Sequence, residues 1–225
     1  MTAGLPSLRG RRSLREEITE LLRAAVMAGE LVPGIVYSAP SLAEQFGVSA
    51  TPVREAMLDL GKEGLVEIVR NKGFRVTQPS AQDLDDITQL RAFLEVPAVR
   101  AIAEAGVSAD DLARLRPLAA EVEAAARRQD FVAHVVMDLE FHLSLLSLGG
   151  NARLVELVRS LRMHSRLYGL RRDGDVDALS ASWHEHVELL DLVAARDGDG
   201  AEALMRRHLG HVRGIWAVGE PPTAG

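Results

Sequence analysis

The 225-residue sequence contains no cysteine. Disulfide bonds and metal sites built from thiolates are therefore excluded, as in proteins of a reducing compartment. Long hydrophobic runs are missing too, although 47% of the residues are hydrophobic, so we expect no membrane-spanning helix. The first residues also lack the apolar segment of a secretory signal peptide. These absences predict a cytoplasmic protein, and the length allows two domains with sizeable cores.

A surplus of positive charge is absent as well, because the formal net charge is -6. The charge is distributed unevenly, however. Residues 1–78 carry ten Lys/Arg and nine Asp/Glu, whereas residues 79–225 carry sixteen and twenty-three. The acidic surplus belongs to the second half of the chain. Charge alone does not predict nucleic-acid binding here, so that prediction must rest on motifs.

Two short helices are predicted on either side of Gly47. Ser41 and Glu44 have the spacing of a capping box at the start of the first one. Glycine enters a left-handed turn without steric cost, so Gly47 ends that helix. An earlier helix, capped by Ser13, comes before them. Its apolar residues recur at helical spacing and predict a buried stripe made of Leu14, Ile18, Leu21, Leu22, Ala25 and Val26.

The helix after Gly47 has the features of a recognition helix. Ser49 or Thr51 can cap it, and Pro52 suits its first turn, where the missing N–H is harmless. Apolar residues recur on its inner face, so Thr51 and Arg54 point outward near its N-terminus. In a helix-turn-helix, side chains at this place reach base edges and phosphates in the major groove.

A two-stranded hairpin follows this helix. Residues 65–69 and 74–77 are predicted strands, and the residues between them form a basic turn. Groups suited to contact backbone phosphates come from Arg70, Asn71, Lys72, Gly73 and Arg75. The arrangement predicts a winged helix-turn-helix DNA-binding domain over residues 1–78. A winged helix that binds protein is the alternative, and the basic turn argues against it.

At LAEQFGVS, TPVREAM and the hairpin, the sequence resembles the winged helix-turn-helix of the GntR family of bacterial transcription regulators. The resemblance implies double-stranded operator DNA as the partner. Pro40 and Ala50 stand at positions where relatives often carry arginine. Arg54 and the hairpin must therefore carry more of the DNA contact.

Beyond a linker at residues 78–80, the sequence predicts an all-helical domain over residues 79–218 and a disordered tail over 219–225. Six amphipathic helices are expected, over residues 81–105, 109–128, 131–148, 152–171, 178–196 and 200–217. Helices of this length pack as an antiparallel bundle. The predicted fold class is therefore mainly α, with an N-terminal winged helix-turn-helix and a C-terminal all-α bundle.

All seven histidines lie in this second part, from His134 onward. Asp138 and His142 stand four residues apart, and so on one face of an apolar helix. His186 and His208 lie among apolar residues of later helices. Three imidazoles and one carboxylate suit a divalent ion such as Zn²⁺, Ni²⁺ or Mn²⁺. Spacing alone leaves open that Asp138 and His142 are simply a hydrogen-bonded pair within the bundle.

The segments DLEFH, GGNARL and HEHVELLDLVAARDGDGAEALMRRHL resemble the FCD effector domain, which follows the GntR-type reader in the FadR subfamily. Six helices rather than seven resembles its VanR-like branch. In the metal-binding members of that family, the ligands correspond to Asp138, His142, His186 and His208 of this chain. The resemblance thus implies a metal-binding effector domain.

Three residues are candidates for contact with a small carboxylate effector. The resemblance implies that Arg91 faces the cavity and binds an organic acid bidentately. The alternative for Arg91 is a surface ion pair with Glu95, four residues on. His164 lies in a helix expected to line the cavity. Asn151 is most simply the N-cap of the following helix, although the resemblance places it near the pocket.

The sequence therefore predicts a homodimeric, ligand-responsive transcription regulator, expected to be a repressor and not an enzyme. A dimer is expected because two DNA-binding domains match the two half-sites of a palindromic operator. Two other functions stay open. One is a metal-dependent hydrolase or lyase in which the Asp/His₃ site activates water. The other is a helical dimer whose metal only stabilises the fold.

Overall fold

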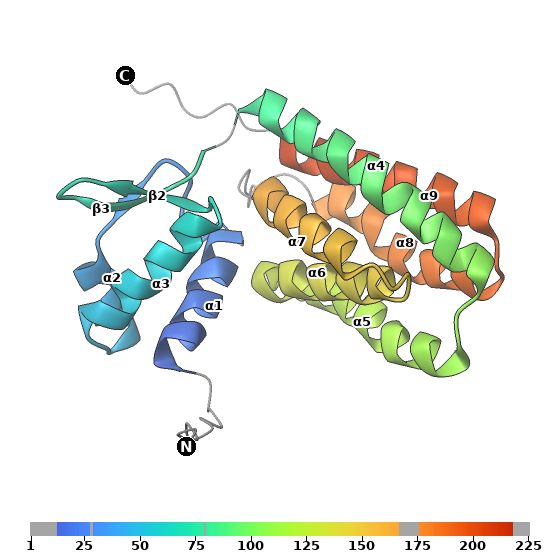
Figure 1. Cartoon of the computed structure of the whole chain (residues 1–225), viewed down its shortest axis with the longest axis horizontal. Coiled ribbons are helices and arrows are strands. Elements are labelled where there is room, and N and C mark those ends of the chain that lie inside the picture. The colour runs from blue at the N-terminus through green and yellow to red at the C-terminus, as the bar shows by residue number, and fades with distance from the viewer. Residues whose placement is uncertain (1–12, 28, 79, 167–175, 218–225) are drawn as a thin grey trace, which may run out of the picture.

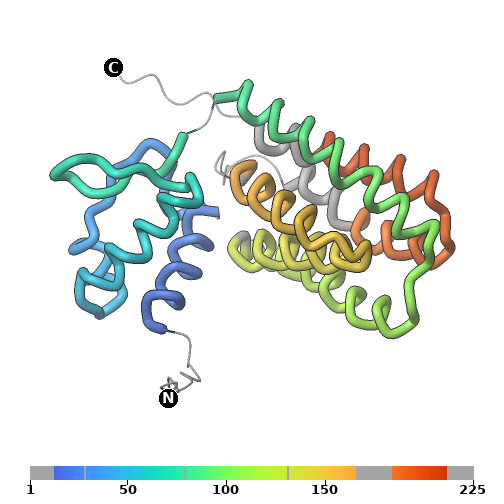
Figure 2. The backbone as a smooth tube through the Cα atoms, in the orientation of Figure 1, coloured from blue at the N-terminus to red at the C-terminus, as the bar shows by residue number. Residues whose placement is uncertain are grey.

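The computed structural model describes residues 13–27, 29–78, 80–166 and 176–217, with the side chains of residues 131, 166, 176–183 and 212–217 outside that description. The described residues form a small N-terminal part, on the left in Figure 1, and a helical bundle, on the right. The backbone tube in Figure 2 shows the same division. The predicted tail at 219–225 and the end of the predicted helix 152–171 lie outside the described residues.

The N-terminal part combines three helices with a small sheet. Its helices are α1 (Leu14–Met27), α2 (Ala39–Phe46) and α3 (Ala50–Lys62). Its strands are β1 (Val36–Tyr37), β2 (Val66–Val69) and β3 (Gly73–Val76). The sheet is antiparallel with the order β1-β3-β2, so the predicted hairpin pairs as expected and gains a third strand that the sequence did not predict.

The start of α2 differs from the prediction. Ser38 is the N-cap, and its hydroxyl accepts a hydrogen bond from the N–H of Ser41 at 3.2 Å. Pro40 fits into the first turn because it lacks an N–H. The predicted capping box of Ser41 and Glu44 is therefore wrong, since both residues already lie inside the helix. Gly47 ends α2 as predicted, with a left-handed φ of 66°.

A hydrophobic core connects α1, α3 and the sheet. The inner face of α3 is fully buried and consists of Val53, Ala56, Met57 and Leu60. Helix α1 buries Ile18, Leu22 and Val26, which recur every fourth residue. Leu14 and Leu21 are exposed, contrary to the prediction. The reason is that α1 meets its neighbours along one narrow stripe, and these two residues lie beside it.

Six helices form the second part among the described residues, as predicted. They are α4 (Ala81–Ala105), α5 (Ala109–Arg127), α6 (Phe131–Ser147), α7 (Ala152–Arg166), α8 (Val176–Ala194) and α9 (Gly198–Ala217). Helix α4 packs against α9 and α7, while α5 packs against α6 and α8. Their inner faces form a separate hydrophobic core. In the described ranges, no helix is both long and apolar enough to cross a membrane.

Candidate DNA-reading surface and metal centre

Helix α3 and the β2–β3 hairpin face a common groove of about 490 Å³. Four of the residues predicted to contact DNA line it: Arg54, Asn71, Lys72 and Gly73. Within the described ranges, the guanidinium of Arg54 and the ammonium of Lys72 take part in no ion pair, so both charges are free for an anionic partner. The structure thus brings the N-terminal half of α3 and the tip of the hairpin to one surface.

The other predicted contact residues are exposed on the same elements. Ser49 is the N-cap of α3, yet its hydroxyl accepts no capping hydrogen bond, and Thr51 lies in the first turn of the helix. Arg70 is exposed at the end of β2. Arg75 differs from these residues because its guanidinium donates to Glu67 across the hairpin at 2.9 Å. We therefore expect Arg75 to contribute less to DNA binding than an unpaired arginine.

Gly73 has a structural reason to be glycine. Its φ is 134°, a value that side chains rarely adopt, and an added Cβ would lie 2.2 Å from the carbonyl oxygen of Tyr37 in β1. The third strand thus approaches the hairpin at this residue. Asn71 has a φ of 62°, which asparagine tolerates better than most residues and which turns the chain at the tip.

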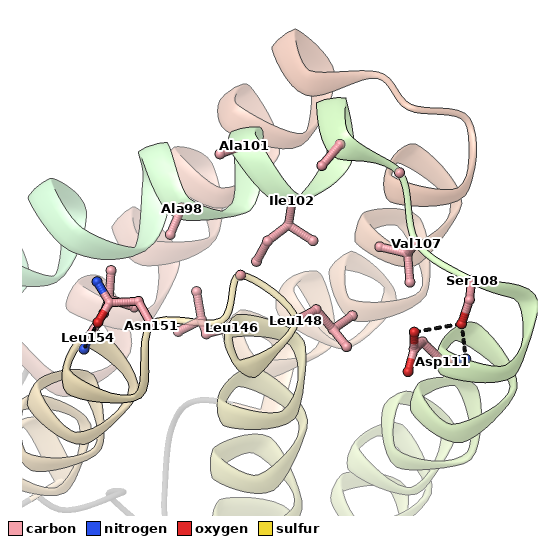
Figure 3. Close-up of a pocket in the computed structure, with 13 residues that line it drawn as sticks. Ala98, Ala101, Ile102, Val107, Ser108, Asp111, Leu146, Leu148, Asn151 and Leu154 are labelled. Atoms are coloured by element: carbon pink, nitrogen blue, oxygen red, sulfur yellow. Dashed lines mark hydrogen bonds between the residues drawn. The ribbon is translucent and has the colours of Figure 1, made fainter.

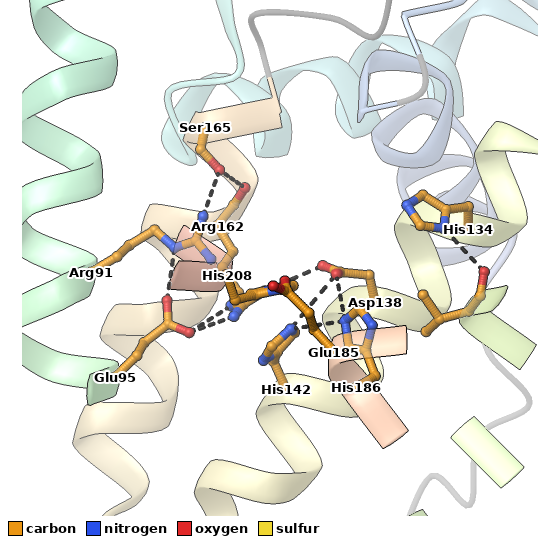
Figure 4. A network of polar contacts seen from close by, with 11 residues as sticks. Arg91, Glu95, His134, Asp138, His142, Arg162, Ser165, Glu185, His186 and His208 are labelled. Carbon is orange, nitrogen blue, oxygen red and sulfur yellow. Dashed lines mark hydrogen bonds and ion pairs between the residues drawn. The ribbon is translucent and has the colours of Figure 1, made fainter. Parts of the chain in front are cut away.

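Inside the bundle, the four predicted metal ligands converge from three helices (Figure 4). Asp138 and His142 lie on α6, His186 on α8 and His208 on α9. Each offers one ligand atom, these atoms lie within 4.8 Å of one another, and all four residues are buried. The Nε2 atoms of His142 and His186 are 3.2 Å apart. Oδ1 of Asp138 lies 3.2 Å from Nε2 of His186.

Glu185 sets the orientation of His208. Nδ1 of His208 lies 2.9 Å from the Oε2 atom of this buried carboxylate. A proton held on Nδ1 by the carboxylate leaves the lone pair of Nε2 facing the cluster. Nε2 of His208 is itself buried and has no hydrogen-bond partner among the residues that the structure describes. A buried nitrogen without a partner is costly, and a metal ion is a partner that such a nitrogen can bind.

The protonation states also suit a metal. Burial lowers the pKa of His142 well below its ordinary value, and the nearby charge of Arg162 lowers it further. Burial lowers the pKa of His208 to about 4. Both imidazoles are therefore neutral near pH 7, the form that coordinates metal ions. Phe141 packs edge-on against His142 and His186, with ring centroids 5.1 Å and 4.9 Å away. The residues present thus fit a divalent ion.

A buried chain of ion pairs adjoins this cluster. Nε of Arg91 donates to Oε1 of Glu95 at 2.7 Å, and Nε of Arg162 donates to Oε2 of the same carboxylate at 3.1 Å. Nη1 of Arg162 donates to Oδ2 of Asp138 at 3.2 Å. Although burial opposes the charged form, Arg162 and Arg91 hold the pKa of Glu95 below its ordinary value. The alternative of a surface pair between Arg91 and Glu95 is therefore wrong, because both side chains are buried.

The three candidate effector contacts lie in different places. Arg91 joins the buried network, and within the described part of the chain its Nη2 atom is buried without a hydrogen-bond partner. Asn151 is the N-cap of α7 and accepts from the N–H of Leu154 at 3.1 Å. It borders a separate surface pocket of about 430 Å³ between α4, the start of α5 and the α6–α7 loop (Figure 3). His164 contacts the carbonyl oxygen of Ser160 through Nδ1 at 2.7 Å and does not join the network.

Three residues of the site were missed by the sequence reasoning: Glu95, Arg162 and Glu185. A signal for Arg162 exists, because it follows the buried Val158 by four residues and so shares its inward face. Burial of charged groups, however, depends on neighbouring helices. The buried partners of Arg162, Glu95 and Asp138, lie 67 and 24 residues away in the sequence.

A winged helix with unpaired basic residues on one surface, followed by a helical bundle with a buried polar centre, is typical of a DNA-binding transcription regulator. Comparison with known families supports this class. Residues 14–76 match the bacterial regulatory proteins of the gntR family, and residues 86–211 match the FCD domain. The chain therefore belongs to the GntR family of transcription regulators and carries an FCD domain.

Known proteins resemble this chain over most of its length. It is 32% identical over 177 residues to the Nta operon transcriptional regulator of Aminobacter aminovorans, covering 79% of this chain and 82% of that protein. It is 31% identical over 198 residues to the HTH-type transcriptional repressor GlaR of Escherichia coli (strain K12), covering 84% and 89%. The solved structure of E. coli McbR/YncC aligns with a TM-score of 0.79 at 25% identity, covering 92% of this chain and 98% of that one. These relatives are transcription regulators, not enzymes, as the sequence predicts.

Proposed function

We propose that this regulator is a homodimeric repressor whose operator affinity is controlled by a small carboxylate bound at a divalent metal ion in the FCD domain. The observation that carries the proposal is the buried Nε2 of His208, which has no partner within the structure and faces two further imidazoles and a carboxylate. A buried cluster of this kind is more stable with a cation bound than without one.

In this proposal His142, His186 and His208 would hold the metal through imidazole nitrogens, and Asp138 would hold it through its carboxylate. Glu185 keeps His208 in the ligating tautomer. When bound, the ion supplies positive charge and open coordination positions for an oxygen ligand. Three imidazoles and one carboxylate would leave room for such a ligand on Zn²⁺, Ni²⁺ or Mn²⁺.

Arg91 is the residue of this chain best placed to bind the second end of a carboxylate effector. It is buried, its Nε is engaged by Glu95, and its Nη2 still lacks an acceptor. A planar guanidinium with a free donor suits an anionic oxygen. Asn151 and His164 already have partners in α7, so we assign the effector contact to Arg91 first.

On the DNA side, we propose that α3 enters the major groove and that the hairpin tip rests on the backbone. Thr51 and Arg54 lie at the N-terminal end of α3, where recognition helices contact base edges. Ser49, Arg70, Asn71 and Lys72 are placed to contact phosphates and sugars. A regulator of this kind acts on the chromosome of a bacterium, which places it in the cytoplasm.

An exposed apolar face supports the homodimer. Leu90 and Phe93 on α4 are 49% and 68% exposed, and Leu157 on the neighbouring α7 is 57% exposed. We infer that these exposed apolar side chains, on two helices that pack against each other, belong to one interaction surface. A second copy bound at this face would relate two winged helices by a two-fold axis, as a palindromic operator requires. Effector binding would then favour an arrangement whose half-site spacing no longer fits that operator.

Two measurements test the proposal. Elemental analysis of the purified full-length protein should find a divalent metal, and the variant Asp138→Asn should lose it. An operator obtained by selection from random duplexes should then bind less tightly once a carboxylate found by thermal-shift screening is added. Arg91→Lys should lose that response while keeping its metal. A protein that binds the operator equally well with every carboxylate tested would refute control by a carboxylate.

A further inference from the structure

We propose that one turn of α7, residues 162–164, couples the metal centre to the winged helix through direct contact and independently of the linker. Arg162 acts as a positioning residue for the centre, while Met163 and His164 contact the DNA-reading part. The proposal rests on the proposed function of the centre. It goes beyond that function by naming the residues that transmit its state.

Arg162 holds one end of this turn inside the bundle. It is 1% exposed, and it donates to Glu95 and to Oδ2 of Asp138. Oδ2 accepts from this guanidinium, while Oδ1 of Asp138 lies 3.2 Å from Nε2 of His186. Arg162 therefore fixes how Asp138 presents itself to an ion. Any change in the position of Asp138 on metal binding acts directly on Arg162 and hence on α7.

Met163, the next residue on α7, contacts the other part of the molecule. Its side chain packs into the hydrophobic core of the winged helix, the core that contains Leu22, Leu60 and Leu65. Consecutive helical residues point about 100° apart, so a helix can direct Arg162 inward and Met163 outward. Val135 on α6 enters the same core. It stands three residues before Asp138, so α6 and α7 each carry a site residue and a contact residue within one turn.

His164 lies on the turn that joins α3 to the hairpin. A Cβ added to Gly64 would lie 2.8 Å from Nε2 of His164, so the ring rests directly on the backbone there. Gly64 has a φ of 76°, and its carbonyl oxygen accepts from the hydroxyl of Thr77 at 2.8 Å. Helix α3 ends on one side of this turn, and β2 begins on the other. A shift of α7 would therefore displace the C-terminal end of α3 and the start of β2.

Packed interiors are stiff, so a small rotation of α7 is transmitted and not absorbed. Helix α1 also contacts α6 and α7. The coupling thus needs no movement of the linker at residues 78–80. It needs only that metal binding and the position of the winged helix favour the same arrangement of α6 and α7, which is the condition for an energetic coupling between two sites.

Hydrogen–deuterium exchange of the full-length protein, with Zn²⁺ present and with Zn²⁺ removed by a chelator, tests this proposal. In the wild type, Zn²⁺ should slow exchange in bundle peptides. It should also change exchange in α1 and the α3–β2 turn by about fivefold or more, the lower end of typical couplings between sites. Met163→Ala and His164→Ala should keep the bundle response and lose the response of the winged helix.

Val158→Ala is the matched control. Val158 lies on the same helix and is fully buried, but it packs in the core of the bundle, so its variant should keep both responses. Arg162→Lys keeps the charge but cannot bridge two carboxylates, and should weaken both responses. Metal content measured on the same samples separates the failures. A wild type that takes up no Zn²⁺ overturns the metal centre and the coupling together. A Met163→Ala and a His164→Ala variant that bind Zn²⁺ and respond like the wild type overturn the coupling alone.

Discussion

Zn²⁺ is expected to stabilise the wild-type chain against heat and to leave the His186→Ala variant unaffected. The four ligand atoms already lie within 4.8 Å of one another, so little rearrangement opposes binding. The ion also gives a partner to Nε2 of His208, whose unpartnered burial costs about 1–3 kcal/mol. At free Zn²⁺ one hundred times the dissociation constant, stabilisation is about 2.7 kcal/mol. A chain of this length gains roughly 2–4 °C per kcal/mol, so the transition should rise by about 5–11 °C.

His184, two residues before His186 on α8, is the control for this experiment. The side chain of His184 is 72% exposed, whereas that of His186 is 1% exposed. Differential scanning calorimetry of the wild type, His184→Ala and His186→Ala, each with and without Zn²⁺, compares every protein with itself. His184→Ala should keep the full rise. An equal rise in His186→Ala, or no rise in the wild type, would refute a buried site made of these ligands.

Three further predictions concern the orientation of a ligand, the DNA surface and the dimer. Glu185→Gln should lower Zn²⁺ affinity by about 10–100-fold in a chelator competition, because the tautomer of His208 is no longer fixed, and unchanged affinity would exclude this role. Lys72→Ala should reduce the salt slope of DNA binding by about 0.9, one phosphate contact, whereas Arg75→Ala should change it less because Arg75 already pairs with Glu67. A larger loss for Arg75 would reverse this ranking. Phe93→Asp should sediment as a monomer in analytical ultracentrifugation, and an intact dimer would place the interface elsewhere.

Much of the fold follows from local signals in the sequence. Gly47 and the six helices of the bundle were predicted from glycine chemistry and apolar spacing, and the structure confirms them. Strand β1 was missed because two residues, Val36 and Tyr37, are too few to show an alternating pattern. The start of α2 was misplaced by a competing cap: both Ser38 and Ser41 suit an N-cap, and only the path of the chain decides between them.

The candidate site could be predicted only where spacing within one helix carries information. Asp138 and His142 share a helix face, and the structure brings His186 and His208 to that face from α8 and α9. The burial of Arg91 and Glu95 could not be predicted, because a pair four residues apart has the same spacing on the surface and in the interior. The pair is buried because Arg162 binds Glu95 from another helix. Charged residues on the inward face of a helix thus indicate a buried polar network.

The affinity of the metal-loaded protein for its operator, measured with and without a saturating small carboxylate, tests the proposed control of DNA binding most directly. The expected result is a loss of about fivefold or more in the wild type, within the usual range of coupling between two sites, and no loss in Arg91→Lys. An operator affinity that stays the same for mono-, di- and tricarboxylates, with metal bound throughout, would contradict that control.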